Sequence, residues 1–183
     1  EGVFSRIEMP LCAVLNDMEH AGFLVDGQEL ARLGEQYRAK LSELTARIYE
    51  LAGESFNINS PKQLGELLFE KMGLPGGKKT QRGYSTDAQV LESLAGQFEI
   101  AAQILEYRKV HKLNSTYIEA LLRLRGADGR IHTSFDQVAT ATGRISSLEP
   151  NLQNIPVRTE MGREIRRAFI APEGCVLVDA DYS

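Results

Sequence analysis

The chain has 183 residues, of which 43% are hydrophobic, which is enough to bury the core of one domain or of one domain and part of another. No apolar run approaches the roughly eighteen residues that cross a bilayer, so we expect no membrane partner. The first residues carry early charges and do not resemble a signal peptide, and both ends look like cuts within a longer protein. Cys12 and Cys175 match no metal-ligand spacing and are expected to be buried or half-buried thiols of a cytosolic protein.

Charge is distributed unevenly along the chain, although the formal net charge is only −4. Residues 1–60 contain 5 Lys and Arg against 10 Asp and Glu, whereas residues 61–125 contain 10 against 7 and residues 140–170 contain 5 against 3. An acidic N-terminal part followed by mildly basic segments is typical of a protein that meets phosphates on one side. By itself this pattern does not establish nucleic-acid binding.

The first two-thirds of the sequence has helical periodicity. Apolar residues recur every three or four positions over 4–21, where Pro10 is expected to bend the helix or delay its regular start. Asp26, with Glu29 three residues later, is typical of a capping box. The helix that follows ends at Gly53 and carries a heptad seam that predicts packing along an antiparallel partner helix; its members are Leu30, Leu33, Tyr37, Leu41, Leu44, Ile48 and Leu51.

Three more helices and one long polar loop are predicted before the last third of the chain. A Ser-Pro-Lys-Gln sequence opens a helix over 60–72, with Ser as the cap and Gln closing a capping box, and Gly73 ends it. Residues 74–85 form a loop rich in Gly, Lys and Arg. A short helix over 86–94 and a long one over 100–124 complete the helical part.

The last third has the pattern of a sheet domain. Residues 126–129 predict a turn, residues 130–137 alternate as a strand does, and residues 175–181 read as a buried strand. The sequence therefore predicts an α+β fold, in which a helical arm of long antiparallel helices leads into the first strands of a sheet, with the boundary near residues 125–129.

A series of motifs occupies the C-terminal stretch. It reads Thr-Gly-Arg-Ile-Ser-Ser at 142–147, Pro-Asn-Leu-Gln-Asn-Ile-Pro at 150–156, and Asp-Tyr-Ser at 181–183. In this order the motifs resemble those of the bacterial family A DNA polymerases, and Ser-Pro-Lys-Gln-Leu at 60–64 and Glu-Tyr-Arg at 106–108 match the family's thumb. The similarity extends over essentially the whole chain.

The resemblance implies a fragment of a larger polymerase fold. Residues 1–125 would form the helical thumb, with a DNA-contacting tip near 73–86, and residues 126–183 would begin the palm. The implied activity is template-directed transfer of a nucleotide from a dNTP to a primer 3′-hydroxyl, with two Mg²⁺ ions, in a monomeric, nucleoid-associated enzyme of the bacterial cytoplasm. A non-catalytic, sequence-independent clamp on primer–template DNA is the alternative, and a helical scaffold based on the heptad seam is a third reading.

Asp181 is the candidate catalytic metal ligand. A carboxylate at the end of a buried strand is desolvated unless it meets a cation or donors, and Mg²⁺ prefers carboxylates, phosphate oxygens and waters. The resemblance assigns Asp181 to both ions and adds the backbone carbonyl of Tyr182, whereas a lone Asp after a strand more often begins a solvated turn. Asp179 is left as a structural or outer-shell residue. Three histidines without ligand spacing are expected to be structural or exposed: His20, His111 and His132.

Arg144 and the amides that follow it are candidate DNA contacts. A guanidinium can span acceptors of neighbouring nucleotides, and minor-groove acceptors occur at every base pair, so such contacts test the shape of the pair without reading its sequence. The resemblance places Arg144 at the primer terminus. We expect Asn151, Gln153 and Asn154 to donate to the same groove or to the sugar-phosphate chain, and Arg158 to lie near the template or the incoming nucleotide. Read alone, the amide-rich string is a polar loop.

The polar loop carries the candidate phosphate contacts of the thumb tip. Lys78, Lys79 and Arg82 can meet phosphates without reading bases, which suits an enzyme that slides along any sequence. Ser115 and Thr116 could add hydroxyl contacts to the phosphate chain, although helix packing explains them nearly as well. We expect a solvated helical face or ion pairs for the remaining arginines of the motif region, Arg163, Arg166 and Arg167.

Overall fold

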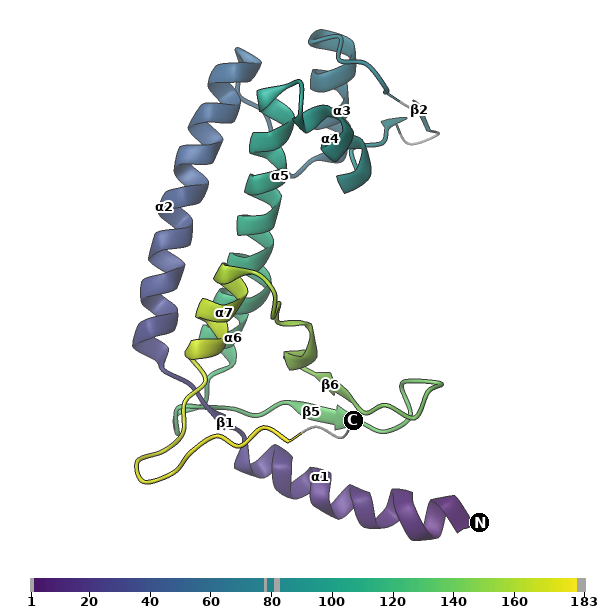
Figure 1. The fold of residues 1–183 in the computed structure, drawn as a ribbon, viewed down its shortest axis with the longest axis vertical. Helices are drawn as coiled ribbons and strands as arrows, with labels where there is room; N and C mark the ends of the chain where they lie inside the picture. Colours follow the sequence, from purple (N-terminus) through teal and green to yellow (C-terminus); the bar gives the residue numbers. More distant parts are fainter. Residues whose placement is uncertain (1, 78, 81–82, 181–183) are drawn as a thin grey trace. The chain divides into compact units, whose positions relative to one another are not determined.

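The structure is a computed structural model that describes residues 2–77, 79–80 and 83–180 (Figure 1). It divides into two compact units, of which the first comprises Glu1–Gly34 with Ser115–Ser183 and the second comprises Glu35–Asn114. This division concerns packing, and the functional boundary near residue 125 stays a prediction. Within the described ranges, no helix combines the length and the apolar character that a membrane span requires.

The cap of helix α2 (Gly27–Ala52) forms only half of the predicted capping box. Asp26 Oδ1 accepts hydrogen bonds from the backbone N–H groups of Gln28 and Glu29, both at 3.0 Å. The Glu29 carboxylate does not return to the cap, because it pairs with Arg32 at 2.6 Å. The backbone N–H of Asp26 donates instead to the carbonyl of Ala168 at 2.8 Å.

The heptad seam of α2 is buried or half-buried along its whole length, as predicted. Within the second unit, α2 runs antiparallel to α5 (Glu99–Lys112), and Arg47 near the end of α2 pairs with Glu99 at the start of α5 at 2.8 Å (Figure 1). This pair raises the pKa of Arg47 and lowers the pKa of Glu99. Because both groups are exposed, burial of the apolar seam rather than the ion pair stabilises the packing.

The distal part of the second unit contains α3 (Pro61–Gly65), the π-helical turn η2 (Glu66–Lys71), strands β2 (Lys79–Thr80) and β3 (Gly83–Tyr84), and α4 (Ala88–Ala95). Ser60 caps α3 as predicted, but the Gln63 carboxamide oxygen accepts from the N–H of Asn57 at 2.8 Å and so does not close the box at Ser60. Helix α4 begins later than predicted, because Asp87 is its cap, with Oδ1 2.9 Å from the N–H of Val90. Thr86 is buried and accepts hydrogen bonds from Arg108.

The first unit contains short helices and short antiparallel strands. Strand β1 pairs with β4, where Phe23 lies opposite Ile131, and β5 pairs with β6, where Phe135 lies opposite Ser147. A π-helical turn precedes α1, so regular α-helix starts only at Met9, beside Pro10, as predicted. The bounds of the elements are η1 Phe4–Glu8, α1 Met9–Ala21, β1 Phe23–Leu24, η3 Leu113–Ile118, α6 Glu119–Leu124, β4 Arg130–Ile131, β5 Ser134–Asp136, β6 Ser146–Leu148, η4 Leu152–Asn154 and α7 Glu160–Arg167.

Two predictions about this unit are wrong. Residues 175–180 form no strand, and Val176, Leu177 and Val178 are 79, 62 and 83% exposed. A strand forms where a neighbour accepts its backbone hydrogen bonds, and no described strand pairs with this stretch. Both cysteines are exposed: the Cys12 thiol on α1 donates to Gln137 Oε1 at 2.9 Å, and Cys175 lies in the unpaired stretch.

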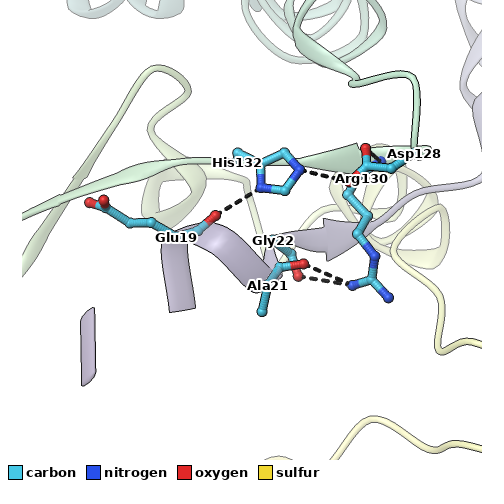
Figure 2. Close-up of polar contacts among 6 residues, drawn as sticks. All are labelled: Glu19, Ala21, Gly22, Asp128, Arg130 and His132. Atoms are coloured by element: carbon cyan, nitrogen blue, oxygen red, sulfur yellow. Dashed lines mark hydrogen bonds and ion pairs between the residues drawn. The ribbon is translucent and has the colours of Figure 1, made fainter. Parts of the chain in front are cut away.

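A polar joint connects the end of α1 with the chain around β4 (Figure 2). His132 Nδ1 lies 2.8 Å from the carbonyl oxygen of Glu19, and Nε2 lies 2.9 Å from Asp128 Oδ2. Both partners are acceptors, so the doubly protonated ring satisfies both; the Glu19 carbonyl and then the Asp128 carboxylate raise the pKa of His132, which nearby Arg130 opposes. Arg130 also donates to two carbonyl oxygens at the end of α1, at 3.0 and 3.2 Å.

Candidate nucleic-acid interface

Arg144 stands on a closed loop before β6. The hydroxyl of Thr140 donates to the carbonyl of Arg144 at 2.6 Å, and Gly143 has a φ of 74°, a left-handed conformation that glycine adopts without strain. The side chain of Arg144 is exposed and makes no hydrogen bond or ion pair with any residue that the structure describes. Its guanidinium is therefore available to a ligand.

Two buried hydroxyl groups hold the turn between β6 and η4. Ser147 is 2% exposed, and its Oγ accepts from the backbone N–H of Leu152 at 3.0 Å. Thr133 is 3% exposed, and its Oγ1 lies 3.0 Å from the carbonyl oxygen of Leu148 and 2.9 Å from that of Pro150. These hydrogen bonds join the strand that follows Arg144 to the turn that carries the amides.

The amides divide between local structure and open surface. Asn151 caps η4, with Oδ1 3.0 Å from the N–H of Gln153. Gln153 reaches back to β6: its Nε2 donates to the carbonyl of Ile145 at 2.7 Å, and its Oε1 accepts from the N–H of Ser147 at 3.4 Å. An amide NH₂ group has two donors, so both side chains keep an N–H for another partner. Asn154 is exposed, and its backbone carbonyl accepts from the Tyr117 hydroxyl at 2.5 Å, while its side chain makes no hydrogen bond with any residue that the structure describes.

Arg158 and the arginines of α7 differ in their partners. The side chain of Arg158 is exposed, and its backbone carbonyl accepts from Arg163 at 3.4 Å. Within α7, Glu160 pairs with Arg163 at 2.6 Å and with Arg167 at 3.9 Å, and Arg163 lowers the pKa of Glu160. The predicted solvated face with ion pairs is therefore confirmed for α7.

At the tip of the second unit, the predicted polar loop contains the β2–β3 hairpin. Lys79 Nζ lies 3.5 Å from the Glu70 carboxylate and 5.3 Å from the centroid of the Tyr84 ring, which packs on Phe69 at 5.2 Å. The backbone at Gly77 packs closely against the Phe69 ring, and only glycine fits there, because a Cβ would lie 2.7 Å from that ring. Lys79 therefore already has an anionic and an aromatic neighbour. Two further predicted contacts, Lys78 and Arg82, lie outside the described residues.

The hydroxyl pair on η3 is also divided. Ser115 is half-buried, whereas Thr116 is exposed. Asp181 and Tyr182 lie outside the described residues. In the described part of the chain, no three or more His, Cys, Asp or Glu side chains gather where a metal ion could bind, and Asp179 is exposed. The Mg²⁺ assignment thus depends on the oxygen-donor chemistry of Asp181.

Sequence reasoning missed the residues that hold this site together. Ser147 ends the motif at 142–147 but was given no role in it, and Thr133 and Tyr117 carry no motif that names a ligand. One signal was present, since Thr133 occupies the same side of the alternating stretch as Ile131 and Phe135, where a small polar residue among inward positions indicates a buried hydrogen bond. Its partners lie 15 and 17 residues further along the chain.

An exposed arginine before β6, with amides on the hydrogen-bonded turn after it, is typical of the nucleic-acid-binding class of proteins. The sequence profile of DNA polymerase family A matches residues 27–183. DNA polymerase I of Bacillus subtilis (strain 168) is 55% identical over 183 residues, covering 99% of this chain and 21% of the relative, and that of Geobacillus stearothermophilus is 52% identical with the same coverage. The chain therefore belongs to DNA polymerase family A, and it spans about a fifth of the length of these relatives.

A solved structure shows the same fold. The POL domain of Pol1 from M. smegmatis, in complex with DNA primer-template and dNTP, superposes with a TM-score of 0.88 at 42% identity. The match covers 94% of this chain and 31% of that chain. The α+β class predicted from the sequence is confirmed by this similarity, which also identifies the chain as part of a polymerase domain.

Proposed function

We propose that this chain is part of a DNA-directed DNA polymerase and binds the primer–template duplex while the complete enzyme adds a dNTP to the primer 3′-hydroxyl. One observation carries the proposal: Arg144, just before β6, and Asn154, on the turn after β6, are both exposed, and buried hydrogen bonds join that turn to β6 and to Thr133. A backbone fixed in advance loses little freedom when the side chains that it presents meet the minor-groove acceptors shared by all base pairs. Such a surface tests pairing without reading sequence.

The other proposed DNA contacts use the hydrogen-bond donors and charges that remain after each side chain has made its local interactions. Asn151 and Gln153 keep one or more N–H donors for the duplex after their local hydrogen bonds. Arg158, whose side chain is exposed, would contact the template or the incoming nucleotide. The phosphate contacts of the proposal are Lys78, Lys79, Arg82, Ser115 and Thr116, of which Lys79 has to exchange its Glu70 partner for a phosphate.

Asp181, with the backbone carbonyl of Tyr182, would hold two Mg²⁺ ions together with carboxylates elsewhere in the complete enzyme. Bound Mg²⁺ supplies activation of the primer hydroxyl and neutralisation of the triphosphate charge. This chain's own residues bind and orient the duplex, so that the primer terminus lies against Arg144. The enzyme would act as a monomer in the bacterial cytoplasm, in contact with the nucleoid.

The test is a chimera in which residues 1–183 replace the matching segment of the Bacillus subtilis DNA polymerase I. The chimera should extend a primer, and Asp181→Asn, which keeps the size but removes the charge, should slow single-turnover extension about a thousand-fold or more. Primer–template affinity should change little. Normal extension by Asp181→Asn, or extension by the 183-residue chain alone, would contradict the assignment.

A second candidate is a sequence-independent clamp on primer–template DNA. It is favoured by the nature of the described groups, because a guanidinium, amides and hydroxyls hold DNA and transfer no nucleotide. If the chimera binds primer–template with the affinity of the Bacillus subtilis enzyme but does not extend it, the clamp is the better description.

A further inference from the structure

Thr133 is a buried hydroxyl that none of the predicted contacts involves. It precedes β5, is 3% exposed, and cannot touch a duplex from the interior of its unit. Its Oγ1 lies within hydrogen-bonding distance of two carbonyl oxygens, those of Leu148 and Pro150. A hydroxyl has one proton, so Thr133 shares it between the end of β6 and the residue before Asn151.

The two ends joined by Thr133 carry different parts of the candidate interface. Strand β6 is anchored to β5 by three paired positions, and Arg144 stands just before it. The turn η4, with Asn154, pairs with no strand that the structure describes and is tied to the rest of the unit by four side chains: Ser147, Gln153, Tyr117 and Thr133. The separation of Arg144 and Asn154 therefore depends on these side-chain hydrogen bonds.

We infer that Thr133 is a positioning residue of the proposed DNA interface, because its hydroxyl sets where the amide-bearing turn lies relative to Arg144. The inference rests on the proposed function. A positioning role differs from a purely structural one in what loss of the Thr133 hydroxyl changes. The loss should displace Asn154, at the other end of the turn, and should therefore alter the rate of extension from a mispaired primer end.

The test uses Thr133→Val in the chimera, since valine keeps the volume and removes the hydroxyl. We expect a loss of about two- to tenfold in kcat/KM for matched primers, the scale of one hydrogen bond, and a smaller difference between matched and mismatched primers. Thr133→Ser keeps the hydroxyl and should behave as the parent. In combination with Asn154→Ala, the losses should be less than additive.

Hydrogen exchange separates positioning from general destabilisation. In Thr133→Val, amides of residues 148–155 should exchange faster, while those of α7 should not change. If Thr133→Val fails to fold, Ser147→Ala, which removes the acceptor of the Leu152 amide, should show the same kinetic pattern. Parent-like kinetics, or full additivity with Asn154→Ala, would overturn the role of Thr133.

The outcomes also separate this inference from the proposed function. If Arg144→Ala and Asn154→Ala reduce extension but Thr133→Val and Ser147→Ala do not, the positioning role fails and the interface stands. If neither Arg144→Ala nor Asn154→Ala has an effect, the interface itself is wrong, and the inference about Thr133 is overturned with it.

Discussion

The polar loop at the tip of the second unit, which contains the β2–β3 hairpin, and the segment of the first unit from Arg144 to η4 were both predicted to contact DNA, but they present their cations differently. Lys79 has a carboxylate at 3.5 Å and an aromatic ring beside it, whereas Arg144 has no partner among the described residues. A phosphate contact needs charge and tolerates a flexible ammonium that exchanges partners. A base-edge contact needs a donor whose position is fixed before the duplex arrives.

The difference also appears in what supports each region. The hairpin has two short strands and packs its Tyr84 ring on Phe69, while the turn after β6 is held by hydroxyls that are almost fully buried. Packing of the Tyr84 ring on Phe69 holds the hairpin against η2, but it does not restrict the Lys79 side chain to one rotamer. Buried hydrogen bonds fix backbone atoms, because a displaced carbonyl would lose its partner in a dry environment.

The largest effect that would sharpen this comparison comes from Arg144. In the chimera, Arg144→Ala should slow extension about ten- to 100-fold, the scale of a charged hydrogen bond, and should weaken discrimination against a mismatched primer end. Arg163→Ala is the matched control, since Arg163 is exposed but paired with Glu160. Equal effects of the two substitutions would break the distinction between an available and an engaged arginine.

A smaller effect, uniform across sequences, is expected at the hairpin. Replacing Lys78, Lys79 and Arg82 together with Ala should weaken duplex binding alike for all sequences, and the slope of log affinity against log salt should flatten by about 0.9 for each phosphate that the variant no longer neutralises. Lys71→Ala is the control, because Lys71 carries the same charge and pairs with Glu54 outside the hairpin. An unchanged slope in the triple variant would place the hairpin away from DNA.

The smallest effect concerns the polar contacts of His132 with Glu19 and Asp128. His132, next to Thr133, has a raised pKa, so its stabilising contribution is complete below its unfolded value of about 6.5 and is lost as pH rises through the folded pKa. Asp128, whose pKa is lowered, contributes above about 3.9 and loses its contribution as pH falls through its folded pKa.

The Tm of the chimera should therefore exceed the Tm of its His132→Gln variant most clearly at pH about 5.5. This difference in Tm should be smaller at pH about 8.5. His20→Gln is the control, because His20 lies in the same unit and its ring contacts the carbonyl of Asn16 in its own helix. A difference that grows with pH would reverse the sign of the His132 contribution.

Local chemistry in the sequence was enough to predict most helices. Asp26, Ser60 and Gly53 act where they were expected, and the heptad seam is buried, because caps and periodicity depend on neighbours a few residues away. The reciprocal halves of both capping boxes failed, since Glu29 and Gln63 found other partners nearby. The hairpin of the tip was not foreseen, because its strands are two residues each and carry no alternation.

The sequence by itself determined the family, the order of the main helices before residue 125, and the residue types that can meet DNA. Which of those residues are available was decided by the tertiary structure: Arg144 and Asn154 are open, Gln153 is partly used by β6, and Lys79 is paired. The exposed tail that was expected to be a buried strand shows the same dependence. A side chain's availability and a strand's existence both depend on partners distant in sequence, which no local pattern specifies.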